Sequence, residues 1–189
     1  MIEEWSKLDS QILGDYRVFR LRQDTSRSPR TGREHHFFVL ETGDWINVIP
    51  ITREGQVVLI RQFRHAIEAV TLEIPGGMVD PDDGEPLETA KRELLEETGY
   101  QAEQVIHIGT MTPNPAILDN HCHTFLALNA RPVAPPQPDG SEDIEFELVD
   151  ISDIPELIAS GQITHALVIS AFYFFDQYKK RNPKKLRFR

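Results

Sequence analysis

The alternation of apolar and polar positions predicts that this chain is rich in short β-strands. Residues 46–51 and 57–60 are apolar runs separated by the turn sequence Arg53-Glu54-Gly55, which is the pattern of two paired strands in a buried sheet. The second run continues to Arg64 with alternating character. Three later segments also have the strand pattern, namely residues 105–109, 124–128 and 144–149. We therefore expect a central sheet formed by the chain beyond residue 45.

The first 45 residues carry a separate group of strand patterns. Apolar or alternating runs occur at residues 12–13, 16–21 and 37–40, and a polar segment rich in Ser, Arg and Pro at residues 26–32 separates the last two. Such a segment between two apolar runs favours a turn. The pattern predicts a β-hairpin arm over residues 1–45, in front of a main domain over residues 46–189.

Helical periodicity predicts two helices towards the C-terminus. The first is a short helix over residues 154–160, which Gly161 stops. The second begins at Thr164 and should bury one face along its length. The apolar residues of that face are Leu167, Ala171, Phe174, Phe175 and Tyr178. Strands and helices in this mixture indicate an α/β fold.

Composition and charge narrow the classes of partner. The chain has 189 residues, of which 40% are apolar and 26% charged, as is ordinary for a globular domain. The net charge of −10 argues against nucleic acid or an anionic membrane as the partner. One cysteine excludes an intrachain disulfide, we expect no signal sequence, and the sequence contains no apolar run of membrane-spanning length. The expected compartment is the cytoplasm.

The stretch with the clearest chemistry is a glycine-rich turn followed by an acidic helix. Gly76 and Gly77 precede a Pro/Asp/Gly turn, and residues 85–98 then have helical periodicity, with Leu87, Ala90 and Leu94 on one apolar stripe. Gly99 follows as a typical residue just beyond a helix end.

Three carboxylates gather on the polar side of this helix. At 100° per residue, Glu93, Glu96 and Glu97 fall within an arc of about 100°. Like charges four residues apart destabilise a helix by a few tenths of a kcal/mol. An acidic face that is simply solvated is the alternative for Glu93 and Glu97 taken alone. A hard divalent cation would compensate the charges and would also bind phosphate oxygens.

The whole string resembles the signature of the Nudix hydrolases, G-x5-E-x7-R-E-U-x-E-E-x-G-U, where U is aliphatic or aromatic. Gly77 supplies the first glycine, and the last part is filled by Arg92, Glu93, Leu94, Glu96, Glu97, Gly99 and Tyr100. The segment is one residue longer than the pattern. Asp83 or Glu85 stands in for the early glutamate, or the turn at residues 81–84 absorbs the extra residue.

The resemblance implies a fold and a branch of the family. It implies the Nudix α/β/α sandwich with a mixed central sheet over residues 46–178, preceded by a strand-rich N-terminal arm. The wider chain is similar to the ADP-ribose pyrophosphatase branch, in which such an arm forms much of a homodimer interface. The features shared with that branch are this arm, the arginine strand at residues 61–64 with the turn at residues 72–77, and Pro115 fifteen residues beyond Tyr100.

The resemblance also implies a metal site. Glu93 and Glu97 are expected to ligate Mg²⁺ or Mn²⁺, helped by Glu96 and the backbone carbonyl of Gly76. Arg92 is expected to orient these glutamates through short ion pairs. Oxygen ligands of this kind are the ones that Mg²⁺ and Mn²⁺ prefer.

Substrate contacts follow from the resemblance in the same way. Arg64 is expected to contact a diphosphate, and Glu73 belongs to the same substrate-binding set. Asn114 and Pro115 are expected to line the sugar end of the substrate, and Phe37 is expected to face the base, either within one subunit or from a partner.

These assignments lead to a predicted reaction, in which Glu142 is the candidate general base. The enzyme would hydrolyse the pyrophosphate of an ADP-ribose-like nucleoside diphosphate sugar to a nucleoside monophosphate and a sugar phosphate. Two alternatives are a dinucleoside polyphosphate or RNA-cap hydrolase and a non-catalytic nucleotide-sugar sensor. The acidic charge disfavours a capped RNA, and the intact glutamates from Glu93 onward disfavour a sensor.

Overall fold

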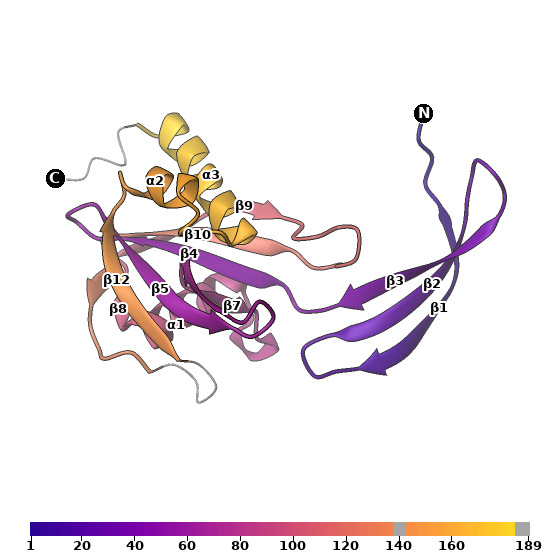
Figure 1. Ribbon diagram of the computed structural model, residues 1–189, viewed down its shortest axis with the longest axis horizontal. Helices are drawn as coiled ribbons and strands as arrows, with labels where there is room; N and C mark the ends of the chain where they lie inside the picture. Colours follow the sequence, from indigo (N-terminus) through magenta and orange to yellow (C-terminus); the bar gives the residue numbers. More distant parts are fainter. Residues whose placement is uncertain (138–142, 184–189) are drawn as a thin grey trace. The chain divides into compact units, whose positions relative to one another are not determined.

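The chain forms two compact units in the computed structural model, which describes residues 1–137 and 143–183. One unit contains Met1–Asp44 together with Thr112–His121, and the other contains Trp45–Met111 together with Cys122–Arg189. Figure 1 shows the elements of both. In the described ranges no helix is both long and apolar enough to cross a bilayer.

The first unit is a three-stranded antiparallel sheet. Its strands are β1 (Ser6–Asp15), β2 (Arg20–Arg27) and β3 (Glu34–Glu41), with β2 in the middle. The prediction of a strand-rich N-terminal region is confirmed. The predicted strand over residues 16–21 is wrong for its first four residues, which form the turn between β1 and β2.

That turn is closed by a hydrogen bond from the Tyr16 amide to the Phe19 carbonyl, at 2.9 Å. Arg17 adopts a left-handed backbone with φ +58°, which a strand does not permit. The rings of Tyr16 and Phe19 lie 5.1 Å apart between centroids. Aromatic residues have high strand propensity, but here their contact stabilises the turn.

A segment from the middle of the chain completes the first unit. Residues 112–121 run alongside the end of β3, where the Leu40 amide donates to the carbonyl of Ile117 at 2.8 Å. The amide group of Asn120 donates to the Gly43 carbonyl at 3.0 Å, and the Thr42 backbone amide donates to the Asp119 carboxylate at 3.3 Å.

The second unit is built on a seven-stranded mixed sheet. Along the sheet the order is β12-β5-β4-β10-β9, with β6 paired to β5 and β7 paired to β4. Only the β4–β10 pair is parallel among these described pairs. The strands are β4 (Trp45–Ile51), β5 (Gln56–Arg64), β6 (Ala69–Glu73), β7 (Gly76–Met78), β9 (Gln104–Met111), β10 (Cys122–Leu128) and β12 (Ile144–Asp150). A short pair, β8 (Tyr100–Gln101) and β11 (Arg131–Pro132), lies outside it.

Helices cover both faces of this sheet. The helix α1 (Pro86–Thr98) lies on one face, and α2 (Ile154–Ala159) and α3 (Ala166–Arg181) lie on the other (Figure 1). Because side chains alternate along a strand, Val48 joins the core under α1 whereas Ile49 joins the core under α3. The predicted α/β sandwich with a mixed sheet is therefore confirmed.

The buried face of α3 differs from the predicted one. Val168 and Phe172 are buried with Ala171 and Phe175, whereas Leu167 is half-buried. The helix is apolar around most of its circumference, so sequence periodicity defines its inner face poorly. Phe174 instead packs against the sheet at Gly109, where the absence of a side chain leaves room for the ring.

The glycine-rich stretch is a strand, where the sequence had indicated a turn. Gly76 and Gly77 pair with Asn47 and Ile46 of β4 as part of β7. A 3-10 turn, η1 (Pro81–Asp83), and Gly84 with φ +77° then lead to α1. Gly99 ends α1 in a left-handed conformation, as predicted, and its amide donates to the Leu95 carbonyl at 2.8 Å.

Packing of α1 on the sheet can be tested with two adjacent leucines. Leu94 is 1% exposed in the core, whereas Leu95 is 37% exposed. Leu94→Ala should lower the free energy of unfolding by about 2–5 kcal/mol because it leaves a cavity, and Leu95→Ala should lower it by about 0.5 kcal/mol or less. Urea unfolding of both variants measures the difference, and equal losses would contradict this placement of α1.

Candidate active site

The helix α1 presents its carboxylates to the edge of β7. Glu97 is 2% exposed, and its Oε2 accepts a hydrogen bond from the Gly76 amide at 3.0 Å. A charged carboxylate withdrawn from water requires such partners. The bond therefore fixes the last turns of α1 against the strand that carries Gly76.

Glu93 lies one turn earlier and packs on Gly77. A Cβ atom at Gly77 would collide with the Glu93 carboxylate, including Oε1. A side chain at position 77 would therefore force the Glu93 carboxylate to move. Together, Gly76 and Gly77 bring a backbone strand and two carboxylates of α1 into one small region.

Arg92 links three carboxylates around this region. Its Nη1 lies 3.0 Å from Oε1 of Glu93 and 2.8 Å from Oε2 of Glu96. Its Nε and Nη2 donate to Asp83 at 3.1 and 2.9 Å. The Asp83 hydrogen bond raises the pKa of Arg92 above its ordinary value and lowers the pKa of Asp83. Among the candidates for the early signature acid, the structure thus places Asp83 on Arg92, whereas Glu85 is the N-cap of α1.

The residues fit a hard divalent cation by their chemistry. Glu93, Glu96, Glu97 and the Gly76 carbonyl are oxygen donors, as Mg²⁺ and Mn²⁺ prefer. Within residues 1–137 and 143–183, no three His, Cys, Asp or Glu side chains already converge as a metal-ligand cluster. The geometry explains this, because Glu93 and Glu96 both point an oxygen at Arg92.

Arg64 and Glu73 form a two-point ion pair beside β7. Nε and Nη2 of Arg64 donate to the two carboxylate oxygens of Glu73 at 2.9 and 2.7 Å. The Glu73 side chain is 3% exposed and that of Arg64 is 41% exposed. Burial would raise the pKa of Glu73, but hydrogen bonds from Arg64 and Thr71 and the nearby positive charge hold this pKa below its ordinary value.

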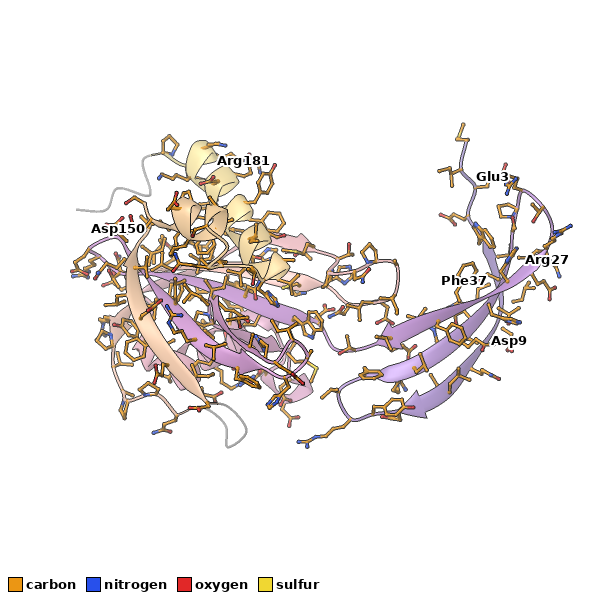
Figure 2. The ribbon with its side chains drawn as sticks, viewed as in Figure 1. Glu3, Asp9, Arg27, Phe37, Asp150 and Arg181 are labelled. Atoms are coloured by element: carbon orange, nitrogen blue, oxygen red, sulfur yellow. The ribbon has the colours of Figure 1, made fainter. Side chains whose placement is uncertain are left out.

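The other predicted substrate residues belong to the first unit or are not described. Phe37, which Figure 2 labels, lies on β3 and is 43% exposed. Its ring meets the Trp5 ring edge-on, with 5.4 Å between the ring centroids. The Asn114 carbonyl accepts from the amides of Ile117 and Leu118, which places Pro115 within a turn. Glu142 lies outside the described residues.

A cavity in the second unit contains residues that the sequence analysis did not select. Trp45, Asn47 and His165 line it together with Arg64 and Glu73. One sequence signal was a polar Asn47 within the apolar run 46–51. His165, immediately before α3, carried no recognisable signal, because its proximity to β4 and β6 arises only in the folded chain.

Known proteins resemble the chain in sequence and in fold. The family profile described as the NUDIX domain matches residues 42–172. An ADP-ribose pyrophosphatase of Bacillus subtilis is 32% identical over 132 residues, covering 69% of this chain and 71% of the relative. An ADP-ribose pyrophosphatase of Mycobacterium tuberculosis is 26% identical over 171 residues, covering 88% and 81%.

A solved structure described as an ADP compounds hydrolase superposes with a TM-score of 0.85 at 19% identity, covering 96% of this chain and 97% of that one. This likeness supports the fold. The family profile spans more than half of the chain, and it agrees with the signature on α1. The chain therefore belongs to the Nudix family, as a hydrolase related to the ADP-ribose pyrophosphatases.

Proposed function

We propose that this protein hydrolyses the pyrophosphate bond of nucleoside diphosphate sugars of the ADP-ribose type, with Mg²⁺ or Mn²⁺ as the cofactor. The products are a nucleoside monophosphate and a sugar phosphate. In the reaction, a water oxygen bonds to one phosphorus, and the bridging oxygen leaves with the other phosphate. The observation that carries the proposal is the group formed by Glu93, Glu97 and Arg92 against Gly76 and Gly77.

The charges of the site support a cation-dependent reaction. Asp83, Glu93 and Glu96 surround one guanidinium, and Glu97 adds a further carboxylate on the same helix. Such a site repels a diphosphate unless positive charge is added. A bound divalent cation would supply it, neutralising phosphate oxygens and lowering the pKa of water.

Each residue of the group has a separate task in this proposal. Glu93, Glu96, Glu97 and the Gly76 carbonyl would hold the cation. Arg92 orients the glutamates, since its planar guanidinium bonds carboxylates on two sides at once. Positioning of this kind accounts for much of the catalysis in phosphoryl transfer.

Residues outside this group would hold the substrate. Arg64 lines the cavity beside β7 and is the proposed diphosphate contact. Phe37, Asn114 and Pro115, which belong to the first unit, remain proposed contacts for the base and the sugar. Glu142 remains the proposed general base on the strength of the family resemblance, because it lies outside the described residues.

A substrate panel tests the proposed reaction directly. The purified protein, incubated with Mg²⁺ and ADP-ribose, ADP-glucose or GDP-mannose, should release a nucleoside monophosphate and a sugar phosphate, which chromatography identifies. A chelator should stop the release, and added Mg²⁺ or Mn²⁺ should restore it. Release of product at an unchanged rate in the chelator would contradict the cation site, and no release from any nucleotide sugar would contradict the reaction.

The metal assignment predicts a severe and local effect of Glu97→Gln. The change removes a charged ligand while keeping the shape of the side chain, so turnover should fall by more than about 100-fold. This loss exceeds the loss that is typical when a residue that only hydrogen-bonds to a metal ligand is changed. Glu88→Gln on the same helix is a matched control, because Glu88 is exposed and pairs with Lys91. Steady-state rates and thermal melting of both variants give the result. Near-normal turnover of a folded Glu97→Gln protein would refute the assignment.

We also propose that the arm over residues 1–45 mediates a homodimer. Its strands carry exposed large apolar side chains, Leu8, Ile12, Phe37 and Phe38, which single-chain sheets usually cover. Sedimentation equilibrium of the full-length protein should therefore give a dimer mass. Phe38→Glu should shift the equilibrium towards monomer, and a purely monomeric unmodified protein would contradict the proposal.

A further inference from the structure

The second unit contains a cavity of about 300 Å³ next to β7. Strands β4, β5 and β7 contribute to its walls, with Glu73 at the end of β6 and His165 at the start of α3. The volume is at the lower end of the range for small-molecule sites, so it suits one ring. Gly76 and Gly77 belong to the wall, and any ligand in the cavity therefore lies beside the candidate metal site.

His165 contributes a buried polar atom without a partner. Within the described part of the chain, Nδ1 of its imidazole is shielded from solvent and makes no hydrogen bond. Although His165 is the N-cap residue of α3, its side chain does not cap the helix. Buried polar atoms are nearly always paired, and leaving one unpaired is unfavourable. The imidazole lines the cavity, but Nδ1 itself is closed to solvent, so a ligand in the cavity would have to bond to the ring through its other nitrogen, Nε2.

Glu73 provides a second position on the same wall. Its Oε1 accepts from Nε of Arg64 at 2.9 Å and from the Thr71 hydroxyl at 2.6 Å, while Oε2 accepts from Nη2 of Arg64 at 2.7 Å. Each carboxylate oxygen has two lone pairs. With one bond to Oε2 in the described residues, that oxygen retains the capacity to accept another.

These groups select the chemistry of the ligand. A hydroxyl donates to Oε2 of Glu73, and it can donate to or accept from the imidazole in either tautomer of His165. The phosphates of a diphosphate have only acceptors at neutral pH, so they can bond to Arg64 at the edge of the cavity but not to the Glu73 carboxylate. Trp45 and Met78 add apolar surface to the lining, against which the C–H groups of a sugar ring can pack.

We propose that this cavity binds a sugar ring of the substrate, with His165 hydrogen-bonded to one ring hydroxyl and Glu73 accepting from a neighbouring one. His165 then determines which nucleotide sugars bind well. The proposal rests on the proposed function, because it assumes a nucleotide-sugar substrate. In ADP-ribose, adjacent hydroxyls occur on both the nucleoside ribose and the terminal ribose, and the test separates these two sources.

The first part of the test compares variants at one position. His165→Ala should raise KM for ADP-ribose by about tenfold, as expected for one lost hydrogen bond, with a smaller change in kcat. His165→Gln keeps a hydrogen-bonding side chain and should recover most of the loss. His107→Ala is the matched control, since His107 lies on β9 and is not a lining residue of the cavity. Thermal melting verifies that each variant is folded. A KM unchanged in His165→Ala would overturn the proposal.

The second part removes the hydroxyl instead of the imidazole. ADP-ribose analogues lacking the 2-hydroxyl or the 3-hydroxyl of either ribose are compared in the unmodified protein and in His165→Ala. The analogue lacking the partner hydroxyl should bind both proteins equally, and its identity assigns the cavity to the terminal or to the nucleoside ribose. If His165→Ala weakens the binding of every analogue as much as it weakens the binding of ADP-ribose, the imidazole does not contact a sugar hydroxyl and the proposal fails.

A binding measurement separates this proposal from the proposed reaction. Calorimetry with ADP-ribose whose bridging oxygen is replaced by methylene requires no turnover. Weaker binding by His165→Ala supports the cavity even if the protein hydrolyses no nucleotide sugar. Turnover of ADP-ribose combined with equal binding by both proteins overturns the cavity and leaves the reaction standing. If the methylene analogue does not bind the unmodified protein, the proposal that the cavity binds a sugar ring is also overturned.

Discussion

The buried contact between Glu97 and the Gly76 amide is the interaction on which the site depends. A carboxylate that is 2% exposed is stable only if charged or polar partners replace water. The contact requires β7 to pair with β4 and α1 to dock through Leu94, so the strand, the helix and the core are mutually dependent. The glycine at position 77 is part of the same constraint, because any side chain there would displace Glu93.

Arg92 holds the charged groups at the contact between α1 and β7 in a fixed arrangement. An arginine can bond Asp83 through Nε and Nη2 while Nη1 reaches Glu93 and Glu96, whereas the single ammonium of a lysine could not hold this fixed geometry. The η1 turn brings Asp83 to the arginine, which at the same time contacts Glu93 and Glu96 of α1. The single guanidinium leaves the group with excess negative charge.

Local patterns predicted what depends on neighbours in sequence. Five strands of the central sheet (β4, β5, β9, β10 and β12), the stop at Gly99 and the arc of carboxylates on α1 were predicted, because each arises from a period or a turn within a few residues. The strands β6 and β7 were not predicted, and the glycines of β7 had indicated a turn. The turn at Tyr16 was not predicted, because aromatic residues favour strands. Only the structure shows that the rings of Tyr16 and Phe19 contact each other across a turn. The cavity was missed for a stronger reason. Asn47, Glu73 and His165 come from three distant segments, and only the sheet and α3 bring them to one wall.

Charge distribution explains how an acidic protein can accept an anionic substrate under the proposed function. A chain with a net charge of −10 does not steer a diphosphate towards itself over long distances. The carboxylates around Arg92 add local repulsion. A bound cation would reduce that local negative charge and contact the phosphate oxygens directly, so cation and substrate would each favour the binding of the other. Arg64 cannot replace the cation in this role, because its pairing with the buried Glu73 makes that wall nearly neutral overall. Under these two proposals, the cation on α1 would neutralise the charge of the diphosphate, and the cavity beside β7 would bind the sugar through hydrogen bonds.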